Sequence, residues 1–195
     1  MKQTETARYY NDVSFRAAVC IPLLKDESGQ ELVLFEQRSS KLYDQPGDIC
    51  FPGGGLESGE TAEQAVRREV CEELLIAPEQ LELTEELSPF VSGNLEITPF
   101  VGTLHGYEGS FDPFETAEVF TVPLQWLLQN EPENHKLEWL PEESETFPYE
   151  RIVGGKKYAW RKRQESNWFY TCQGRVIWGI TAKILRAWVL SLNNE

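Results

Sequence analysis

Hydrophobic and polar positions vary along the chain in the pattern of short strands combined with two helices. Residues 14–24 and 31–38 are mainly apolar runs separated by the turn-forming sequence DESGQ, and they predict a pair of strands. Two further strand-like runs lie within residues 81–104 and are divided near residues 92–94. Residues 119–128 predict a strand that enters a short helix at a proline.

Two segments have the spacing of amphipathic helices. The first helix begins after Thr61, which can form a capping box with Gln64, and it extends to about Leu75. The second lies near the end of the chain, where apolar residues recur three and four positions apart, as in a helix packed on a core. These residues are Ile180, Ile184, Leu185, Trp188, Val189 and Leu192. Strands mixed irregularly with helices predict the α+β class rather than a doubly wound sheet.

The region between the short helix and the last helix is more polar. Residues 129–150 are rich in Glu and Pro and predict a loop or flap. Two hairpins are expected after it, turning at Gly154-Gly155 and at Gln173-Gly174. The chain has no internal repeat and 195 residues, so one domain is expected.

Composition and charge narrow the classes of protein. The chain is 41% hydrophobic, enough for a packed core, so it is not disordered as a whole. Its 18 Lys and Arg against 32 Asp and Glu give a formal net charge of −14, which argues against a nucleic-acid or membrane partner. An anionic ligand would therefore need a local basic patch or bound metal ions.

Targeting and redox signals point to the cytoplasm. The apolar runs are much shorter than the roughly 20 residues of a membrane-spanning helix, and residues 1–12 lack the apolar stretch of a signal peptide. The four cysteines are far apart and include no C-x-x-C pair, so neither a disulfide framework nor a zinc site is expected. These features predict a cytoplasmic protein with reduced thiols.

Three glutamates on the first helix are the strongest candidates for chemistry. Glu69, Glu72 and Glu73 are spaced i, i+3, i+4, which for an arbitrary triplet indicates a solvated acidic face. A helical wheel instead sets Glu69 and Glu73 inside the apolar arc and Glu72 at its edge, and it assigns Arg67 and Arg68 to the outer face. Inward carboxylates repel one another, so bound divalent cations are predicted, and oxygen ligands suit Mg²⁺ or Mn²⁺.

A loop rich in Gly and Pro, residues 45–55, precedes this helix. Taken alone, it indicates a tight turn. Beside metal-binding carboxylates, its glycines would let the backbone approach phosphate groups closely. Metal ions offset the charge that develops when a phosphate ester or anhydride is cleaved, so the combination predicts that kind of reaction.

The same stretch resembles a known family motif, the Nudix box, G-x5-E-x7-R-E-U-x-E-E-x-G-U. The matching residues, within about 54–76, are Gly54, Glu60, Arg68, Glu69, Val70, Glu72, Glu73 and Ile76. Leu75 stands where the box has a glycine that ends the helix with positive φ, a conformation that Leu adopts only with strain. The resemblance implies a Nudix fold, an α+β architecture with a mixed β-sheet sandwiched between α-helices, in a single domain over residues 1–195.

The resemblance also implies roles for the box residues. Glu72 and Glu73 would be the principal metal ligands, and Glu69 would be a further ligand or the base acting on water. Gly54 would supply a backbone carbonyl to the metal. Arg68 would orient Glu69, and Glu60 would hold Arg68. The activity implied is hydrolysis of a nucleoside diphosphate linked to another group.

A second resemblance concerns the substrate. The segment before the box is similar to the motif LLTxR(S/A)x3Rx3Gx3FPGG of coenzyme A pyrophosphatases, with Tyr43 in place of the second arginine. The residues implied to bind substrate are Arg38, Ser39, Phe51 and Gly53. The implied reaction is hydrolysis of the pyrophosphate of coenzyme A or its thioesters to 3′,5′-ADP and 4′-phosphopantetheine or its acyl form. The similarity is weakest over residues 131–166, a variable insertion.

Several assignments stay open at this point. Glu115 and Glu118 are candidates for an additional metal ligand or base, or are solvated loop carboxylates. The basic residues within 156–163 could meet substrate phosphates or balance acidic neighbours. Other Nudix substrates, namely ADP-ribose, dinucleotides or nucleoside triphosphates, and a non-catalytic binding or regulatory module are the alternatives. A small nucleotide-derived substrate is the expected partner, and the sequence is compatible with a homodimer.

Overall fold

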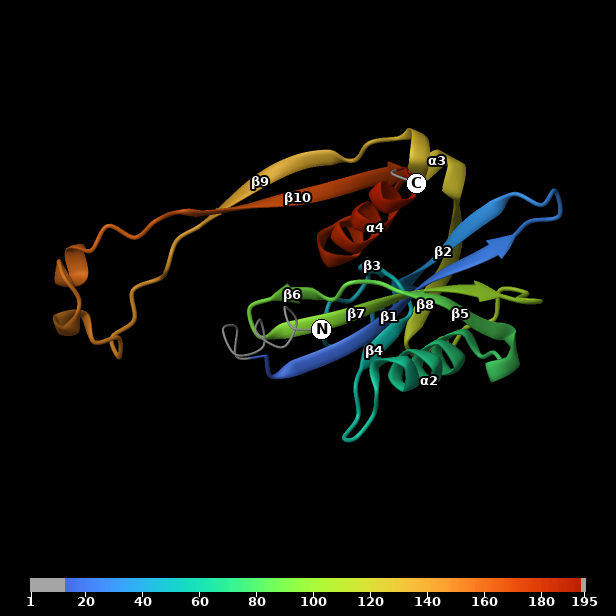
Figure 1. Cartoon of the computed structure of the whole chain (residues 1–195), viewed down its shortest axis with the longest axis horizontal. Coiled ribbons are helices and arrows are strands. Elements are labelled where there is room, and N and C mark those ends of the chain that lie inside the picture. Colours follow the sequence, from blue (N-terminus) through green and yellow to red (C-terminus); the bar gives the residue numbers. More distant parts are fainter. Residues whose placement is uncertain (1–12, 194–195) are drawn as a thin grey trace.

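Within residues 13–193, which the computed structural model describes, eight strands form a mixed sheet with the long strand β1 at its centre (Figure 1). The strands of this sheet are β1 (Phe15–Lys25), β2 (Glu31–Arg38), β3 (Ile49–Cys50), β4 (Gly53–Gly55), β5 (Leu81–Glu86), β6 (Phe90–Ser92), β7 (Leu95–Leu104) and β8 (Thr116–Pro123). The other elements are α2 (Ala62–Leu74), η1 (Pro78–Gln80), α3 (Leu124–Gln129), β9 (Glu133–Trp139), η2 (Tyr149–Arg151), η3 (Gly155–Lys157), β10 (Arg163–Cys172), β11 (Arg175–Ile177) and α4 (Gly179–Leu192).

The sheet is mixed because one pairing is parallel and the others are antiparallel. β1 pairs in parallel with β7, in the register Phe15↔Leu95 to Leu23↔Thr103. β2 and β4 pair antiparallel with β1, β3 and β8 with β2, and β5 and β6 with β7. This arrangement brings β4 beside the first half of β1, and α2 packs against both strands.

Helices cover both faces of this sheet, as predicted. Alternate residues of β1 face opposite sides: Ala18 and Cys20 pack with the apolar face of α2, whereas Ala17 and Ile21 pack with α4. A strand that is covered on both faces must be apolar at successive positions, which explains the run AAVCI. The predicted α+β sandwich is confirmed, and β1, β2, α2 and α4 follow the predicted ranges closely.

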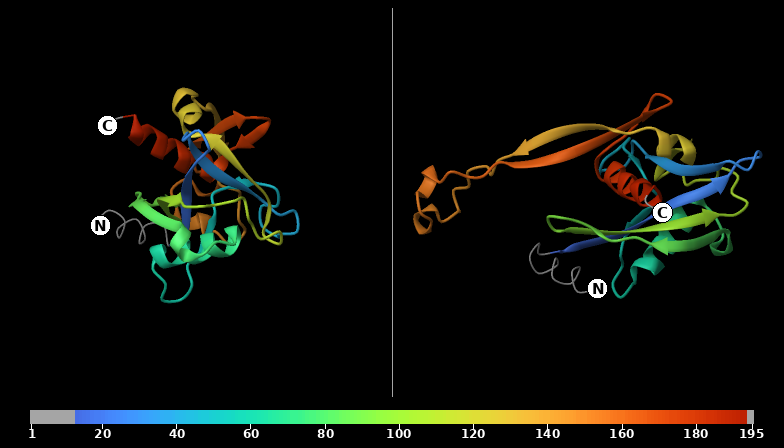
Figure 2. Two further views of the ribbon diagram at one scale, coloured as in Figure 1. Left: turned by 90° about the vertical axis from the view of Figure 1, so that its right-hand side faces the viewer. Right: turned by 45° about the horizontal axis from the view of Figure 1, so that its top comes forward.

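A second sheet, in the order β11-β10-β9, carries a ribbon that extends far from the sandwich (Figures 1 and 2). Seven residue pairs, from Glu133↔Phe169 to Trp139↔Arg163, hold β9 to β10. All seven residues of β9 are exposed. We call residues 133–169 the arm, and residues 140–162, which contain η2 and η3, its tip.

The arm corrects two expectations from the sequence. Residues 129–150 are not all loop or flap, because 133–139 form β9. Gly154-Gly155 does not join two strands; it lies inside the tip, separated from η2 by two residues and at the start of η3. The hairpin at Gln173-Gly174 is confirmed between β10 and β11, and both turn residues have positive φ.

Further expectations concern residues 81–104 and the segments that could target the chain or cross a membrane. The break near residues 92–94 is confirmed as the β6–β7 turn, although residues 81–104 form three strands rather than two. Residues 1–12, on which the absence of a signal peptide was judged, lie outside the described residues. No helix within residues 13–193 has the length and apolar character needed to cross a bilayer.

Candidate active site

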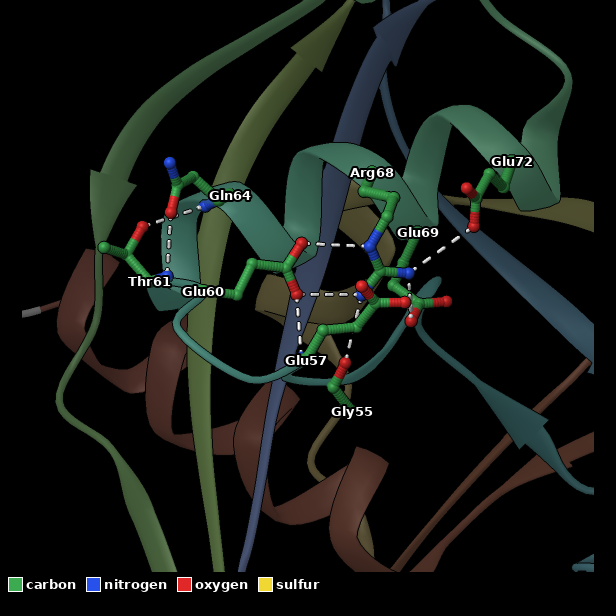
Figure 3. Close-up of polar contacts among 8 residues, drawn as sticks. All are labelled: Gly55, Glu57, Glu60, Thr61, Gln64, Arg68, Glu69 and Glu72. Carbon is green, nitrogen blue, oxygen red and sulfur yellow. Dashed lines mark hydrogen bonds and ion pairs between the residues drawn. The ribbon is translucent and has the colours of Figure 1, made fainter.

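Local backbone features define both ends of α2. Thr61 and Gln64 form the predicted capping box: the Thr61 hydroxyl accepts from the Gln64 N–H at 3.2 Å, and the Gln64 side chain accepts from the Thr61 N–H at 2.9 Å (Figure 3). At the other end, Leu75 is left-handed with φ 51° and ψ 47°. A leucine in this conformation is strained, which confirms what the missing glycine predicted.

The acidic residues of α2 differ in burial in the order that the helical wheel predicts. Glu73 is only 4% exposed, the side chain of Glu69 is 17% exposed, and that of Glu72 is 64% exposed. Glu73 and Glu69 therefore point inward beside the sheet, and Glu72 lies at the edge of the same face.

Arg68 links the helix to the loop that precedes it (Figure 3). Its Nε and Nη2 donate to the two carboxylate oxygens of Glu60 at 2.9 and 3.0 Å, and its Nη1 donates to Glu69 at 2.8 Å. Its Nη2 also donates to the Gly55 carbonyl at 3.1 Å, and Glu72 lies 3.5 Å from Nη1. The prediction that Arg68 points away from the inward acids was wrong. Its long side chain folds back, and its guanidinium pairs with Glu69.

Glycine is required at two positions of β4 that face these acids. Residues 45–55 are thus not all loop, because they contain the short strands β3 and β4. Gly53 has φ +140°, and a Cβ there would lie 2.3 Å from the Ala18 carbonyl oxygen of β1. A Cβ on Gly54 would lie 2.5 Å from Cδ of Glu69. The Gly53 N–H donates to Glu73 Oε2 at 2.7 Å. The backbone of β4 is thus pressed against both inward carboxylates.

A fourth carboxylate, missed in the sequence, lies behind this pair. Glu36 on β2 is 2% exposed and accepts from the Thr116 hydroxyl at 3.1 Å and the Cys50 thiol at 3.3 Å. Burial raises the pKa of Glu36 above its usual value, although these two donors oppose the rise. Its available signal was an acid at the end of the apolar run LVLF.

Burial also raises the pKa of the Glu73 carboxyl well above its usual range. The negative charge of Glu36 adds to this rise, as do those of Glu69 and Glu115, while the Gly53 N–H opposes it. By contrast, Arg68 donates to Glu60 and lowers the pKa of that carboxyl. The site therefore has one carboxylate held by an arginine and another buried among like charges.

The structure separates the two candidate acids outside the box. Glu115 is near enough to Glu36 and Glu73 for its charge to raise both pKa values, and its carbonyl accepts from the Ser39 N–H at 2.7 Å. Glu118 instead forms an ion pair with Arg175 of β11. Glu115 is thus brought to the site, and Glu118 is directed away from it.

The residues implied to bind substrate have varied surroundings. Arg38 donates from Nε and Nη2 to the Asp44 carbonyl, both at 3.2 Å. Ser39 is buried, and its hydroxyl accepts from the Lys41 N–H at 3.3 Å. Phe51 is in the core, where its ring stacks on Phe35 at 5.0 Å between centroids.

Two other sequence features lie apart from these contacts. Tyr43, which replaces the second arginine of the motif, is almost fully exposed. The basic segment 156–163 lies on the tip of the arm, at the end of the molecule remote from α2 (Figure 1). It therefore does not reach the acids of its own chain in this arrangement.

The donors at α2 suit a hard divalent cation by their chemistry. Glu69, Glu72 and Glu73, with the carbonyl of Gly54, offer only oxygen, and the crowding of Glu73 by like charges is the condition that a cation relieves. Within residues 13–193, no three His, Cys, Asp or Glu side chains converge in a geometry that could hold a metal. The ligand set thus stays a prediction, based on donor type and charge.

Comparison with known proteins gives the family. The mouse protein named peroxisomal coenzyme A diphosphatase NUDT7 is 38% identical over 124 residues, which are 62% of this chain and 52% of that protein. Nudix hydrolase 15, mitochondrial, of Arabidopsis thaliana is 30% identical over 177 residues, 87% of this chain and 56% of that protein. This chain thus spans about half the length of both relatives.

A structural comparison and a family comparison complete this picture. The Nudix hydrolase RenU from M. smegmatis has a TM-score of 0.49 and 23% identity, over 58% of this chain and 73% of that one. A family model described as the NUDIX domain matches residues 14–169, most of the chain and the whole of α2 and its preceding loop. The chain therefore belongs to the Nudix family.

Proposed function

We propose that this protein hydrolyses the pyrophosphate bond of coenzyme A or its thioesters, with Mg²⁺ or Mn²⁺, to 3′,5′-ADP and 4′-phosphopantetheine or its acyl form. The observation that carries the proposal is the close apposition of the glycine loop to the inward acids, with Gly53 donating to Glu73 and Gly54 against Glu69. The printed name of the mouse relative supports the coenzyme A substrate.

The chain's own groups would divide the work between holding and reacting. Glu60 fixes the Arg68 guanidinium through two hydrogen bonds, and Arg68 in turn orients Glu69. Glu69, oriented in this way, would act on the attacking water or complete the ligand set. Glu115 lies near enough to Glu73 to be an alternative base, since its charge acts on that carboxyl.

Glu69, Glu72, Glu73 and the Gly54 carbonyl would hold the cation. When bound, a divalent ion offsets charge on the phosphate oxygens and acidifies water. The buried Glu73 would then have the counter-charge that its surroundings lack, because Arg68 is directed to Glu60 and Glu69.

The substrate prediction depends on the 3′-phosphate of coenzyme A. Dephospho-coenzyme A, ADP-ribose and dinucleotides lack this group, so a site that contacts it with one cation would prefer coenzyme A by about tenfold in kcat/KM. Arg38, Lys41 and the basic segment 156–163 are the candidate cations. The preference should decline as salt rises, because a partly exposed contact is screened.

The test is incubation with Mg²⁺ or Mn²⁺ and a panel of nucleoside diphosphate compounds, with products identified by mass spectrometry. Formation of 3′,5′-ADP, with kcat/KM for coenzyme A about tenfold above dephospho-coenzyme A, supports the proposal. Faster turnover of ADP-ribose than of both would reassign the substrate. No turnover of any compound would favour the non-catalytic module, against which the intact Arg68 network argues.

The cellular compartment belongs to the same proposal. The spacing of the cysteines and the missing targeting signal predict a cytoplasmic location, whereas the printed names of the relatives refer to peroxisomes and mitochondria. Cell fractionation of the full-length protein, with compartment markers, is the direct measurement.

A further inference from the structure

The arm carries an exposed apolar stripe that its own chain leaves uncovered. Leu137 and Trp139 lie two apart on β9 and therefore share one face of the ribbon, and Leu140 follows them. Their exposed fractions are 51%, 54% and 58%. A two-stranded ribbon is only marginally stable by itself in water, so large apolar side chains on it indicate a contact beyond its own chain.

Positive charge is concentrated in the second half of the tip and the first residue of β10. Residues 151–163 contain six of the 18 lysines and arginines and none of the 32 aspartates and glutamates. Lys162 pairs with Glu138, and Lys156 lies over the Tyr149 ring. Lys157 and Arg161 form no ion pair within residues 13–193. These two cations are free to meet an external anion.

The cations near the α2 site are already engaged. Arg68 binds Glu60, Glu69 and the Gly55 carbonyl, Arg38 binds the Asp44 carbonyl, and Arg67 binds Glu63. Apart from the six basic residues of 151–163, the chain has 12 basic and 32 acidic residues. A pyrophosphate substrate would enter a strongly negative region with few free cations, while the free cations are held on an arm pointing away from it (Figure 1).

One arrangement accounts for both the uncovered apolar stripe and the unpaired cations Lys157 and Arg161. We propose that the protein is a homodimer in which each arm reaches across the other copy, covers its apolar stripe there, and places Lys157 and Arg161 at the acidic α2 site of that second copy. The seven paired residues of the ribbon extend about 20 Å at about 3.3 Å per residue, so the tip can reach a neighbouring subunit. A two-fold dimer makes the exchange reciprocal.

Charge complementarity favours a second copy over other partners. Residues 151–163 are basic, whereas the rest of the chain, including the four glutamates at 142–150, is acidic, so two copies attract where segment 151–163 of each meets the body of the other. The contribution of the cations to phosphate binding rests on the proposed function, whereas the dimer itself does not.

Sedimentation velocity of the full chain tests the dimer. We expect a species of twice the 22.4 kDa chain mass, and at least a tenfold weaker association for Lys157→Glu/Arg161→Glu and for Leu137→Ser/Trp139→Ser. Lys157→Glu has a matched control in Lys25→Glu, an exposed lysine at the end of β1, which should associate like the wild type. Near-ultraviolet circular dichroism verifies that each variant is folded.

Mixing two defective chains tests the contribution in trans. Glu73→Gln has an intact tip, and Lys157→Glu/Arg161→Glu has an intact site; each alone should hydrolyse coenzyme A at least tenfold more slowly than wild type. After subunit exchange at equal amounts, half of the dimers are mixed and hold one complete site, so activity should recover to about one quarter of wild type. A mixture that stays at the mean of the two variants overturns the contribution in trans.

The remaining outcomes separate this inference from the proposed function. A wild type that is monomeric throughout overturns the dimer, and so does a monomer whose tip binds vesicles of phosphatidylcholine and phosphatidylserine. A wild type that cleaves no compound but loses its dimer on Lys157→Glu/Arg161→Glu contradicts the proposed function and retains the arm-mediated dimer. An active wild type whose dimer and kcat/KM are both unaffected by the tip variant contradicts only the inference.

Discussion

The α2 site and the arm differ in how their charged side chains are paired and buried. At the α2 site, a single guanidinium satisfies Glu60, Glu69 and a loop carbonyl, and Glu73 is almost fully buried. On the arm, every residue of β9 is exposed, and the tip cations Lys157 and Arg161 form no ion pair in the described part of the chain. Changes at α2 should therefore alter chemistry and stability, whereas changes on the arm should alter association and, at Lys157 and Arg161, the activity of the second copy.

Removing one buried charge gives the largest expected effect. Glu73→Gln should lower kcat of the proposed hydrolysis by about a thousandfold or more, because the metal loses a charged ligand. Without metal, its Tm should be unchanged or higher, since the amide avoids the burial cost and the repulsion from Glu36. Glu138→Gln on the arm is the control and should match wild-type kcat. A metal-free Glu73→Gln that melts well below wild type would mean that the carboxylate is structural.

Replacing the guanidinium of Arg68, which joins Glu60 and Glu69, should give the next largest effect. Arg68→Lys keeps the charge but cannot hold both oxygens of Glu60 while reaching Glu69, so kcat/KM should fall by about tenfold to a hundredfold. Tm should fall by about 5 °C, because partly buried carboxylates lose donors. Arg67→Lys, on the exposed side of the same helix, should change neither quantity appreciably. Equal behaviour of the two variants would remove the special role of Arg68.

The end of α2 and the tip of the arm also differ in backbone strain. The tip uses glycine at its positive-φ positions 154 and 155, whereas α2 ends on Leu75. Leu75→Gly should raise the free energy of unfolding by about 1 kcal/mol, because glycine adopts φ 51° without strain and the leucine is already 59% exposed. Arg67→Gly, inside the helix, should instead lower it by about 1 kcal/mol. Chemical denaturation measures both, and a loss of stability in Leu75→Gly would contradict the strain.

The smallest effect is expected where the arm joins the body. Glu165 of β10 pairs with Lys183 of α4, and this donor lowers the pKa of the Glu165 carboxyl below its usual 4.5. The folded state therefore prefers the charged form, so its stabilisation is present above pH 4.5 and is lost as pH falls through the lowered pKa. Glu165→Gln should cost less than about 1 kcal/mol near pH 7 and nothing in strong acid. A difference in stability that is the same at all pH values would exclude the ion pair as its cause.

Local signals made most of α2 predictable from the sequence. Its capping box, its period and the inward positions of two glutamates all depend on residues within one or two turns of each other. The direction of Arg68 was not predictable from the wheel, because a wheel places Cα atoms and the guanidinium lies several bonds beyond. Its partners in the loop, Glu60 and Gly55, depend on how the chain enters the helix.

Long-range contacts account for what the sequence did not reveal. Glu36 is satisfied by Thr116, 80 residues away, and nothing near Glu36 identifies that donor. The sequence predicts a loop at β9 because residues 129–150 are rich in Glu and Pro, and the alternation of Leu137 and Trp139 with Glu138 is too short to indicate a strand. The proposed contacts of the arm lie outside the chain, so neither its sequence pattern nor its own packing specifies them.

The parallel pairing of β1 with β7 has a consequence for how the protein is made. Phe15 pairs with Leu95, so the loop and helix of the site lie inside a closed segment of the chain of about 80 residues. Closing such a segment costs chain entropy before the strand pairing repays it, which makes this step slow relative to formation of the helix. During synthesis, α2 emerges after β1 and β4, against which it packs, but β1 has its parallel partner only once β7 has left the ribosome. The active site therefore forms late, and a chain that stalls before residue 104 exposes its apolar box helix to aggregation.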